Sequence, residues 1–215
     1  MQDYPWFQHY DAGVPKTIGT YPAGTLLDAI DEALRERPHA PAFLYKGRSV
    51  SWKELNDASD AFAIALAKLG VLPGDRVACL LPNCPQFFIG ELAAWKLGAV
   101  YVPLNPIYTE DELVGPLEDT GAKVVLVLSA FYERMKAVQR RVPGVQHVVA
   151  TNIKEWFPPL LKFIFTLLVE EKAGHRATLR DGDQWLPALL EQYRGQIPVD
   201  PRPSPDHDAL LLMSG

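Results

Sequence analysis

The sequence has few cysteines, no run of basic residues and no recognisable secretory signal. Its two cysteines, Cys79 and Cys84, are too few for a disulfide framework, and their spacing is not a metal-binding pattern. A formal net charge of −5 without a Lys/Arg cluster argues against a nucleic-acid partner. Residues 1–6 contain neither a basic region nor an apolar run, which a secretory signal would need. Together these absences favour a reduced, cytoplasmic setting.

What the sequence does have is the composition of an ordinary folded domain, with 48% hydrophobic and 22% charged residues in a chain of 215. Residues 1–24 contain several prolines and glycines and are predicted to form an irregular N-terminal arm. A helix is predicted over residues 25–37 and a hairpin over residues 42–51. Ser51 and Glu54 form a capping box that opens a second helix, which is expected to run to Leu69.

After this helix, near-continuous Val/Leu segments alternate with helical segments of similar or greater length. Such alternation is typical of parallel βαβ units whose sheet is covered on both faces. The predicted fold class is therefore α/β, with a largely parallel sheet, helices on both faces and a small β-hairpin apart from the sheet's centre. Strands are predicted over residues 76–81, 99–102, 123–128 and 145–150. The intervening helices are predicted over residues 86–97, from the Thr109–Glu112 capping box to Thr120, and up to Arg141.

Two asparagines follow the first two of these strands, at the edge where ligands usually bind in such sheets. They are Asn83, in a Pro-Asn pair, and Asn105, in the segment 103–106. Each can be interpreted as a ligand-facing side chain. Each can also be interpreted as part of a rigid turn in which the amide satisfies nearby backbone groups, and for the two asparagines taken alone this second interpretation is favoured.

Residues 153–172 are unusually apolar and are predicted to form a helical insertion. Phe163 and Leu167 widen its apolar stripe beyond that of a normal core-facing helix. The segment is too short to span a bilayer, which takes about 20 apolar residues, and Lys162 interrupts it. The favoured interpretation is that the helix packs on the domain or on a part of the protein that this chain lacks. Alternatively, its aromatic side could enter a membrane interface while the flanking lysines meet lipid headgroups. Burial of both Phe163 and Leu167 would reject the membrane interpretation.

The end of the chain is predicted to be a buried strand over residues 209–213 that leads into Ser214 and Gly215. A small hydroxylic residue and a glycine after a strand are typical of the start of a phosphate-binding loop, because glycine lets backbone N–H groups approach an anion. The alternative is a Ser-Gly turn with no ligand. A short helix is also predicted over residues 185–193.

In their order along the chain, these segments resemble the N-terminal part of the adenylate-forming enzymes, which include acyl-CoA synthetases, luciferases and peptide-synthetase adenylation domains. The resemblance covers about residues 20–215 and is carried by YKGRSVSWKEL (45–55), LGVLPGDRVACLLPN (69–83), KLGAVYVPLNPIYTEDEL (96–113) and DHDALLLMSG (206–215). The segment WFPPLLKF (156–163), followed by a charged stretch, resembles the long-chain fatty acyl-CoA ligases in particular.

The resemblance implies that residues 25–215 are the N-terminal portion of an AMP-binding domain, cut at the start of its ATP phosphate loop. Ser214 and Gly215 would be the first residues of that loop and would help to bind ATP. The family's other ATP-binding residues, its acidic metal ligand and its catalytic lysine would lie beyond residue 215. No catalytic residue and no metal ligand is therefore assigned within the chain.

The activity implied is that of a long-chain fatty acid–CoA ligase, which uses ATP, Mg²⁺ and coenzyme A and forms an acyl-adenylate first. The 215-residue chain alone is expected to be inactive. The expected partners are a fatty acid substrate and, through residues 153–172, the inner face of a membrane; a homodimer of the whole enzyme is left open. The alternatives are a synthetase of the same superfamily acting on a different acid, or a non-catalytic module that binds a lipid or membrane surface.

Overall fold

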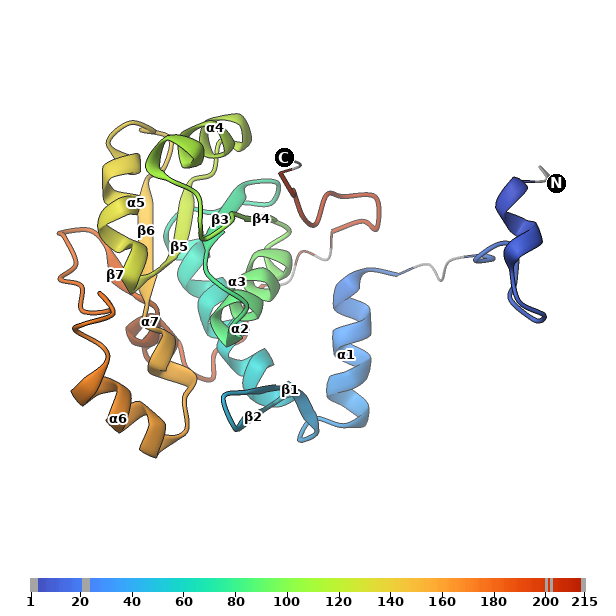
Figure 1. Cartoon of the computed structure of the whole chain (residues 1–215), viewed down its shortest axis with the longest axis horizontal. Coiled ribbons are helices and arrows are strands. Elements are labelled where there is room, and N and C mark those ends of the chain that lie inside the picture. Colours follow the sequence, from blue (N-terminus) through green and yellow to red (C-terminus); the bar gives the residue numbers. More distant parts are fainter. Residues whose placement is uncertain (1–3, 21–23, 200, 202, 214–215) are drawn as a thin grey trace.

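The computed structural model describes residues 4–20, 24–199, 201 and 203–213. The body of the molecule has three layers, with a parallel sheet between two groups of helices (Figure 1). In Figure 1, residues 4–20 stand apart from this body as an arm. The described part of the arm contains one short 3-10 helix, η1 (Pro5–His9). Proline favours such a start because its fixed φ suits the first helical position.

One helix and a separate hairpin precede the main sheet. α1 (Leu26–Glu36) begins at a capping box formed by Thr25 and Asp28. β1 (Pro41–Tyr45) and β2 (Arg48–Ser51) pair antiparallel in a two-stranded sheet of their own. Lys46 and Gly47 join them with φ angles of 50° and 87°, and a type I′ turn needs two such positive values. The prediction of a hairpin apart from the main sheet is confirmed.

The main sheet has five strands in the order β4-β3-β5-β6-β7, and each of its described strand pairs is parallel. The strands are β3 (Arg76–Leu80), β4 (Val100–Pro103), β5 (Val124–Leu128), β6 (His147–Thr151) and β7 (Gln184–Trp185). The first four are the predicted strands, displaced by at most two residues, so the α/β prediction is confirmed. β7 was not expected, because two residues are too few to show a strand period.

Helices cover both faces of this sheet (Figure 1). They are α2 (Trp52–Lys68), α3 (Pro85–Lys96), α4 (Glu110–Thr120), α5 (Tyr132–Gln139), which η2 (Ser129–Phe131) precedes, and α7 (Leu186–Gln192). Val77 and Cys79 of β3 lie in the core with α2, α3 and α7, whereas Ala78 and Leu80 lie in the core with α4 and α5. Burial on both faces is why the strands are apolar without alternation. Cys79 packs in the core as predicted, and burial raises the pKa of its thiol.

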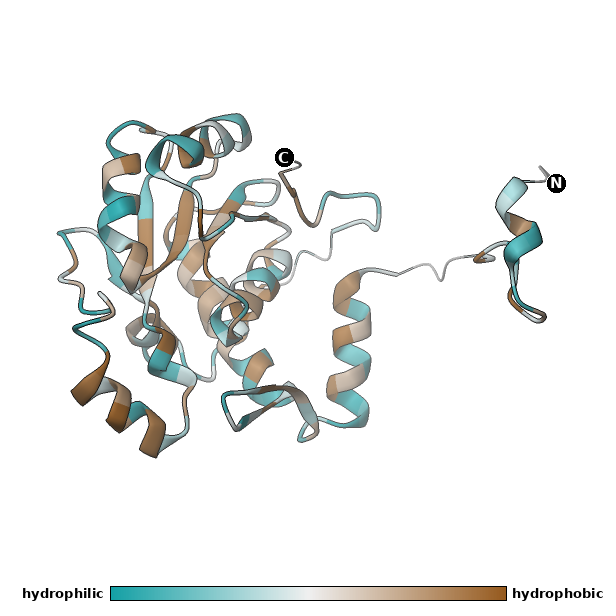
Figure 2. Ribbon diagram, viewed as in Figure 1, coloured by the Kyte–Doolittle hydropathy of each residue, from teal (hydrophilic) through white to brown (hydrophobic). Residues whose placement is uncertain are grey.

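The apolar segment 153–172 is not the single helix that the sequence predicts. η3 (Ile153–Trp156) is a 3-10 turn, Phe157 is extended and buried, and α6 (Pro159–Leu168) begins only after Pro158. Proline has no N–H and a fixed φ, so the Pro158–Pro159 pair ends one element and starts the next. In Figure 2, α6 is a largely hydrophobic helix at the margin of the molecule.

Candidate functional site

The parallel strands all end at one edge of the sheet, and the segments that follow them lie side by side there. β3 leads into residues 81–83 and β4 into residues 104–106. The backbone N–H of Leu104 donates to the carbonyl of Cys79 at 2.8 Å, which ties the end of β4 to the end of β3. In open α/β sheets, this carboxyl edge is where ligands bind.

The final described segment, residues 209–213, runs along the outer side of β4. Tyr101 donates its N–H to Ala209 and accepts one from Leu211, both at 3.0 Å, and Leu210 forms a parallel bridge with Tyr101. Trp95 also donates its indole N–H to the Ala209 carbonyl at 2.7 Å. The prediction of a buried strand here is wrong in two respects, because a single bridge replaces a strand and the side chains are only partly buried. At the outer edge of a sheet the chain has only one neighbour to pair with.

This segment nevertheless heads toward the carboxyl edge, because it runs parallel to β4. The predicted ATP-loop residues Ser214 and Gly215 come next in the sequence and lie outside the described residues. Their role in binding ATP therefore stays a prediction.

A pocket of about 410 Å³ opens at this edge, between α3 and the ends of β3 and β4. Its wall is largely apolar, with Leu104, Leu210 and Met213 among the lining residues, and its described lining contains no lysine, arginine or histidine. The pocket therefore suits an apolar group. A phosphate would need donors from residues that are not in this lining.

Glu91 is the acidic member of the described pocket lining and was missed by the sequence reasoning. Burial raises the pKa of its carboxyl above the ordinary value for glutamate. No described residue forms a hydrogen bond or ion pair with that carboxyl. The signal that could have revealed it is local, since Glu91 is the sole acidic residue in the sequence of α3.

The two asparagines at this edge have different surroundings. Asn105 accepts a hydrogen bond from the N–H of Ile107 through its side-chain oxygen at 3.2 Å, which is the local turn interpretation. The same loop is held by Arg134, whose guanidinium donates to the carbonyls of Pro106 and Tyr108 at 2.8 and 2.7 Å. Asn83 is exposed and lines the pocket, so of the two asparagines it is the one available to a ligand.

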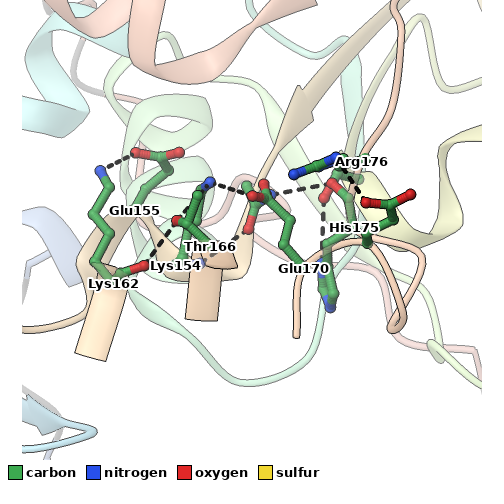
Figure 3. Close-up of polar contacts among 10 residues, drawn as sticks. Lys154, Glu155, Lys162, Thr166, Glu170, His175 and Arg176 are labelled. Carbon is green, nitrogen blue, oxygen red and sulfur yellow. Dashed lines mark hydrogen bonds and ion pairs between the residues drawn. The ribbon is translucent and has the colours of Figure 1, made fainter. Parts of the chain in front are cut away.

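A second polar cluster lies where β6 ends (Figure 3). Asn152 donates through its amide to Glu170 at 2.8 Å and to the His175 carbonyl at 3.1 Å. Lys154 pairs with Glu170 at 2.6 Å and donates to Thr166 at 3.0 Å. These groups satisfy one another, so the cluster fastens the segment around α6 to the sheet. It borders a pocket of about 540 Å³.

His175 is the histidine of this cluster, at the end of the segment that follows α6. Burial lowers the pKa of its ring, and the carboxylate of Glu170 opposes that shift. The ring lies beside the hydroxyl of Ser129, with 3.3 Å between Nδ1 and Oγ, and in edge contact with Phe165. The neutral ring is thus the form that suits the folded cluster.

The described residues contain no group of three or more His, Cys, Asp or Glu side chains arranged to hold a metal ion. Over the same described part of the chain, no helix combines the length and apolar character needed to cross a membrane.

Comparison with known proteins gives matches over most of the chain. The family model described as AMP-binding enzyme matches residues 30–212. A long-chain-fatty-acid–CoA ligase of Haemophilus influenzae is 31% identical over 185 residues, covering 82% of this chain and 33% of the relative. One of Escherichia coli O6:H1 is 29% identical over 213 residues, covering 98% of this chain and 38% of the relative.

A solved structure of acetoacetyl-CoA synthetase from Streptomyces lividans superposes with a TM-score of 0.69 at 22% identity, covering 87% of this chain and 28% of that one. At this identity the likeness shows a shared fold. The chain spans about a third of the length of the curated relatives that it matches.

Proposed function

This chain belongs to the AMP-binding enzyme family, and from that premise we propose that it forms the N-terminal part of a long-chain fatty acid–CoA ligase. The observation that carries the proposal is its 29–31% identity to proteins of that name over 82–98% of its length. The largely apolar pocket at the carboxyl edge supports the proposal, because it offers a wall that a fatty acyl chain can contact.

The reaction of such a ligase has two steps. An oxygen of the fatty acid carboxylate bonds to the α-phosphorus of ATP as the bond to pyrophosphate breaks, which gives an acyl-adenylate. The sulfur of coenzyme A, having lost its proton, then bonds to the acyl carbon as the bond to AMP breaks. Chemistry of this kind depends on positioning and on stabilising phosphate charge, so most of the catalytic work falls to phosphate-binding groups.

In this proposal the chain contributes the floor of the site. The parallel sheet fixes the ends of β3 and β4, and the segment 209–213 runs toward the same edge. Ser214 and Gly215 come next in the sequence. Their backbone N–H groups and the hydroxyl of Ser214 would begin the cradle for the phosphates of ATP. Mg²⁺, when bound, would neutralise phosphate charge through ligands outside the described residues.

The test is an assay of the complete product of the gene that encodes this chain. With ATP, Mg²⁺ and coenzyme A, we expect palmitate to give acyl-CoA and AMP in equal amounts, with a higher kcat/KM than octanoate or acetoacetate. A preference for a short acid would leave the family intact and replace the long-chain proposal with a synthetase for a different acid. Absence of AMP formation with every acid would overturn the proposal.

The 215-residue chain by itself is expected to form no acyl-CoA under the same conditions. The described lining of the pocket at the carboxyl edge has no basic side chain to bind phosphate. The relatives are about three times as long as the region that they share with this chain. Acyl-CoA above the level of a protein-free blank would contradict this expectation. A cytoplasmic location and a homodimeric whole enzyme remain part of the proposal, and gel filtration of the complete gene product tests the dimer.

A further inference from the structure

α6 is oriented with its apolar side toward solvent. Five of its side chains recur at helical spacing and are exposed: Leu160, Phe163, Ile164, Leu167 and Leu168. Phe163 and Leu167, whose burial would have rejected a membrane contact, are 62% and 64% exposed. A surface helix of a globular protein normally turns such a stripe toward the core. Both side chains are therefore accessible on the surface of the described residues.

The side of α6 that faces the domain is held mainly by polar contacts (Figure 3). Lys162 pairs with Glu155 at 2.7 Å, and Thr166 accepts a hydrogen bond from Lys154 at 3.0 Å. Lys154 continues to Glu170 just beyond the helix at 2.6 Å. Phe165 adds a ring contact with Phe157, whose centroid lies 5.4 Å away. These contacts fix the orientation of the helix and thereby hold its apolar stripe outward.

The charges around α6 favour a negatively charged partner. The three acidic residues of the segment 153–176, at positions 155, 170 and 171, are each paired with a basic side chain. Lys172, just after α6, and Lys46, in the hairpin turn, are exposed and form no ion pair with a described residue. Gly47, next to Lys46, lies beside Pro158 at the start of the helix. Unpaired lysines therefore flank the stripe, although the whole chain carries a net charge of −5.

We propose that the outward face of α6, flanked by Lys46 and Lys172, docks on the surface of an anionic lipid bilayer. The apolar side chains enter the boundary between headgroups and acyl chains while the two lysines meet lipid phosphates. Lys154 and Lys162 take no part in headgroup contact, because they are engaged with Glu170 and Glu155. The docking rests on the geometry of α6, and only its use in delivering a fatty acid rests on the proposed ligase function.

A second copy of the chain suits this face less well than a bilayer does. If two copies paired symmetrically through α6, Lys46 and Lys172 of one copy would lie near the same two lysines of the other copy. The acids of the segment 153–176 are already paired with basic side chains and would not offset this repulsion. A bilayer that contains acidic phospholipid supplies the missing negative charge over the whole face.

The experiment is vesicle flotation of the complete product of the gene that encodes this chain, which separates bound protein from aggregates because aggregates sink. Vesicles of phosphatidylcholine with 30% phosphatidylglycerol, in roughly physiological salt, are compared with pure phosphatidylcholine. We expect flotation with the anionic vesicles, and a partition coefficient about tenfold or more lower for the Phe163→Ser/Leu167→Ser variant. The control Ile197→Ser/Val199→Ser removes two equally apolar, more exposed side chains of the C-terminal connector and should float like the unmodified chain.

A second pair of variants tests the charges. Lys46→Glu/Lys172→Glu should weaken binding to anionic vesicles and leave binding to neutral vesicles unchanged. Lys68→Glu, at the end of α2 about 25 Å along that helix from the hairpin, is the matched control and should have no effect. Circular dichroism establishes that each variant keeps the fold.

The proposal is overturned if the unmodified chain does not float with anionic vesicles, or if the Ser variant floats as well as the control. It is also overturned if light scattering shows a dimer that the Ser variant alone abolishes, since the face would then belong to a second copy. Because flotation does not depend on ligation, a failure of the ligase assay leaves this result unaffected.

Discussion

Glu91 shows how a single side chain at the candidate site differs from what its sequence position suggests. It is the one acid in the sequence of α3, it lines the pocket at the carboxyl edge, and no described residue pairs with its charge. A carboxyl whose folded pKa is raised prefers to be protonated in the native state. The native state therefore loses stability as pH rises through the unfolded value of about 4.3 toward neutrality.

Glu91→Gln is predicted to raise the free energy of unfolding at pH 7 and to change it little at pH 4. Glutamine keeps the shape of the side chain and removes the buried charge that costs stability only when the carboxyl is ionised. Urea unfolding at the two pH values measures the difference. Equal effects at both pH values would mean that packing, not charge, explains the change.

Lys96→Met is predicted to destabilise the fold by about 3 kcal/mol or more, since it leaves the largely buried carboxylate of Asp60 without its ion-pair partner. The Lys96 side chain is 9% exposed and lies 2.6 Å from the carboxylate of Asp60, with a further bond to Ser59 at 2.7 Å. These contacts join α3 to α2. The matched control is Lys53→Met, which removes an exposed pair with Asp57 on the same helix α2 and should have little effect. Similar urea midpoints for the two variants would contradict the prediction.

At the scale of elements, the close approach of α3 to the sheet depends on Gly90. A Cβ placed there would meet Leu126 Cδ2 and the Tyr101 hydroxyl, each at 2.9 Å, which is closer than real Cβ contacts. Both neighbours belong to the buried core, so neither can move away freely. Glycine is otherwise costly in a helix, and packing outweighs propensity at this position.

Gly90→Ala is therefore predicted to destabilise the protein by about 1–3 kcal/mol, although alanine is the better helix former. The Tyr101→Phe background removes one of the two close atoms and should reduce the cost of the alanine. A thermal or urea double-mutant cycle measures this coupling. Additive effects would show that the Tyr101 hydroxyl is not what the new methyl group meets.

At the scale of the whole molecule, the two ends of the described chain differ in how they join the body. Residues 4–20 include no buried side chain, whereas residues 209–211 exchange two backbone hydrogen bonds with β4 and accept a third bond from Trp95. The arm and the C-terminal segment should thus contribute unequally to stability.

Deletion of residues 1–20 is predicted to leave the urea midpoint unchanged, and deletion of residues 209–215 to lower it. The first deletion removes no buried side chain among the described residues 4–20, and the second exposes the outer edge of β4. Circular dichroism against urea concentration gives both midpoints. A clear loss of stability on removing the arm would show that its aromatic side chains pack on the body.

The sequence by itself determined the elements whose information is local. Continuous Val/Leu runs between helical segments specified the four parallel strands, because burial on both faces removes alternation from such strands. The capping box at Ser51 fixed where α2 begins and the Lys46–Gly47 pair fixed where the hairpin turns, since each depends on a few adjacent residues. The family resemblance came from motifs in the same stretches.

The tertiary structure alone decided the features that depend on distant partners. β7 is a strand only because β6 lies beside it, and residues 209–213 form a single bridge because β4 is the one described strand that pairs with them. The apolar stripe of α6 faces outward because Lys154 and Glu155 hold its polar side, which helical periodicity cannot reveal. Glu91 became a site residue through burial. In each case the deciding contact joins segments separated in the sequence, where a local pattern carries no information.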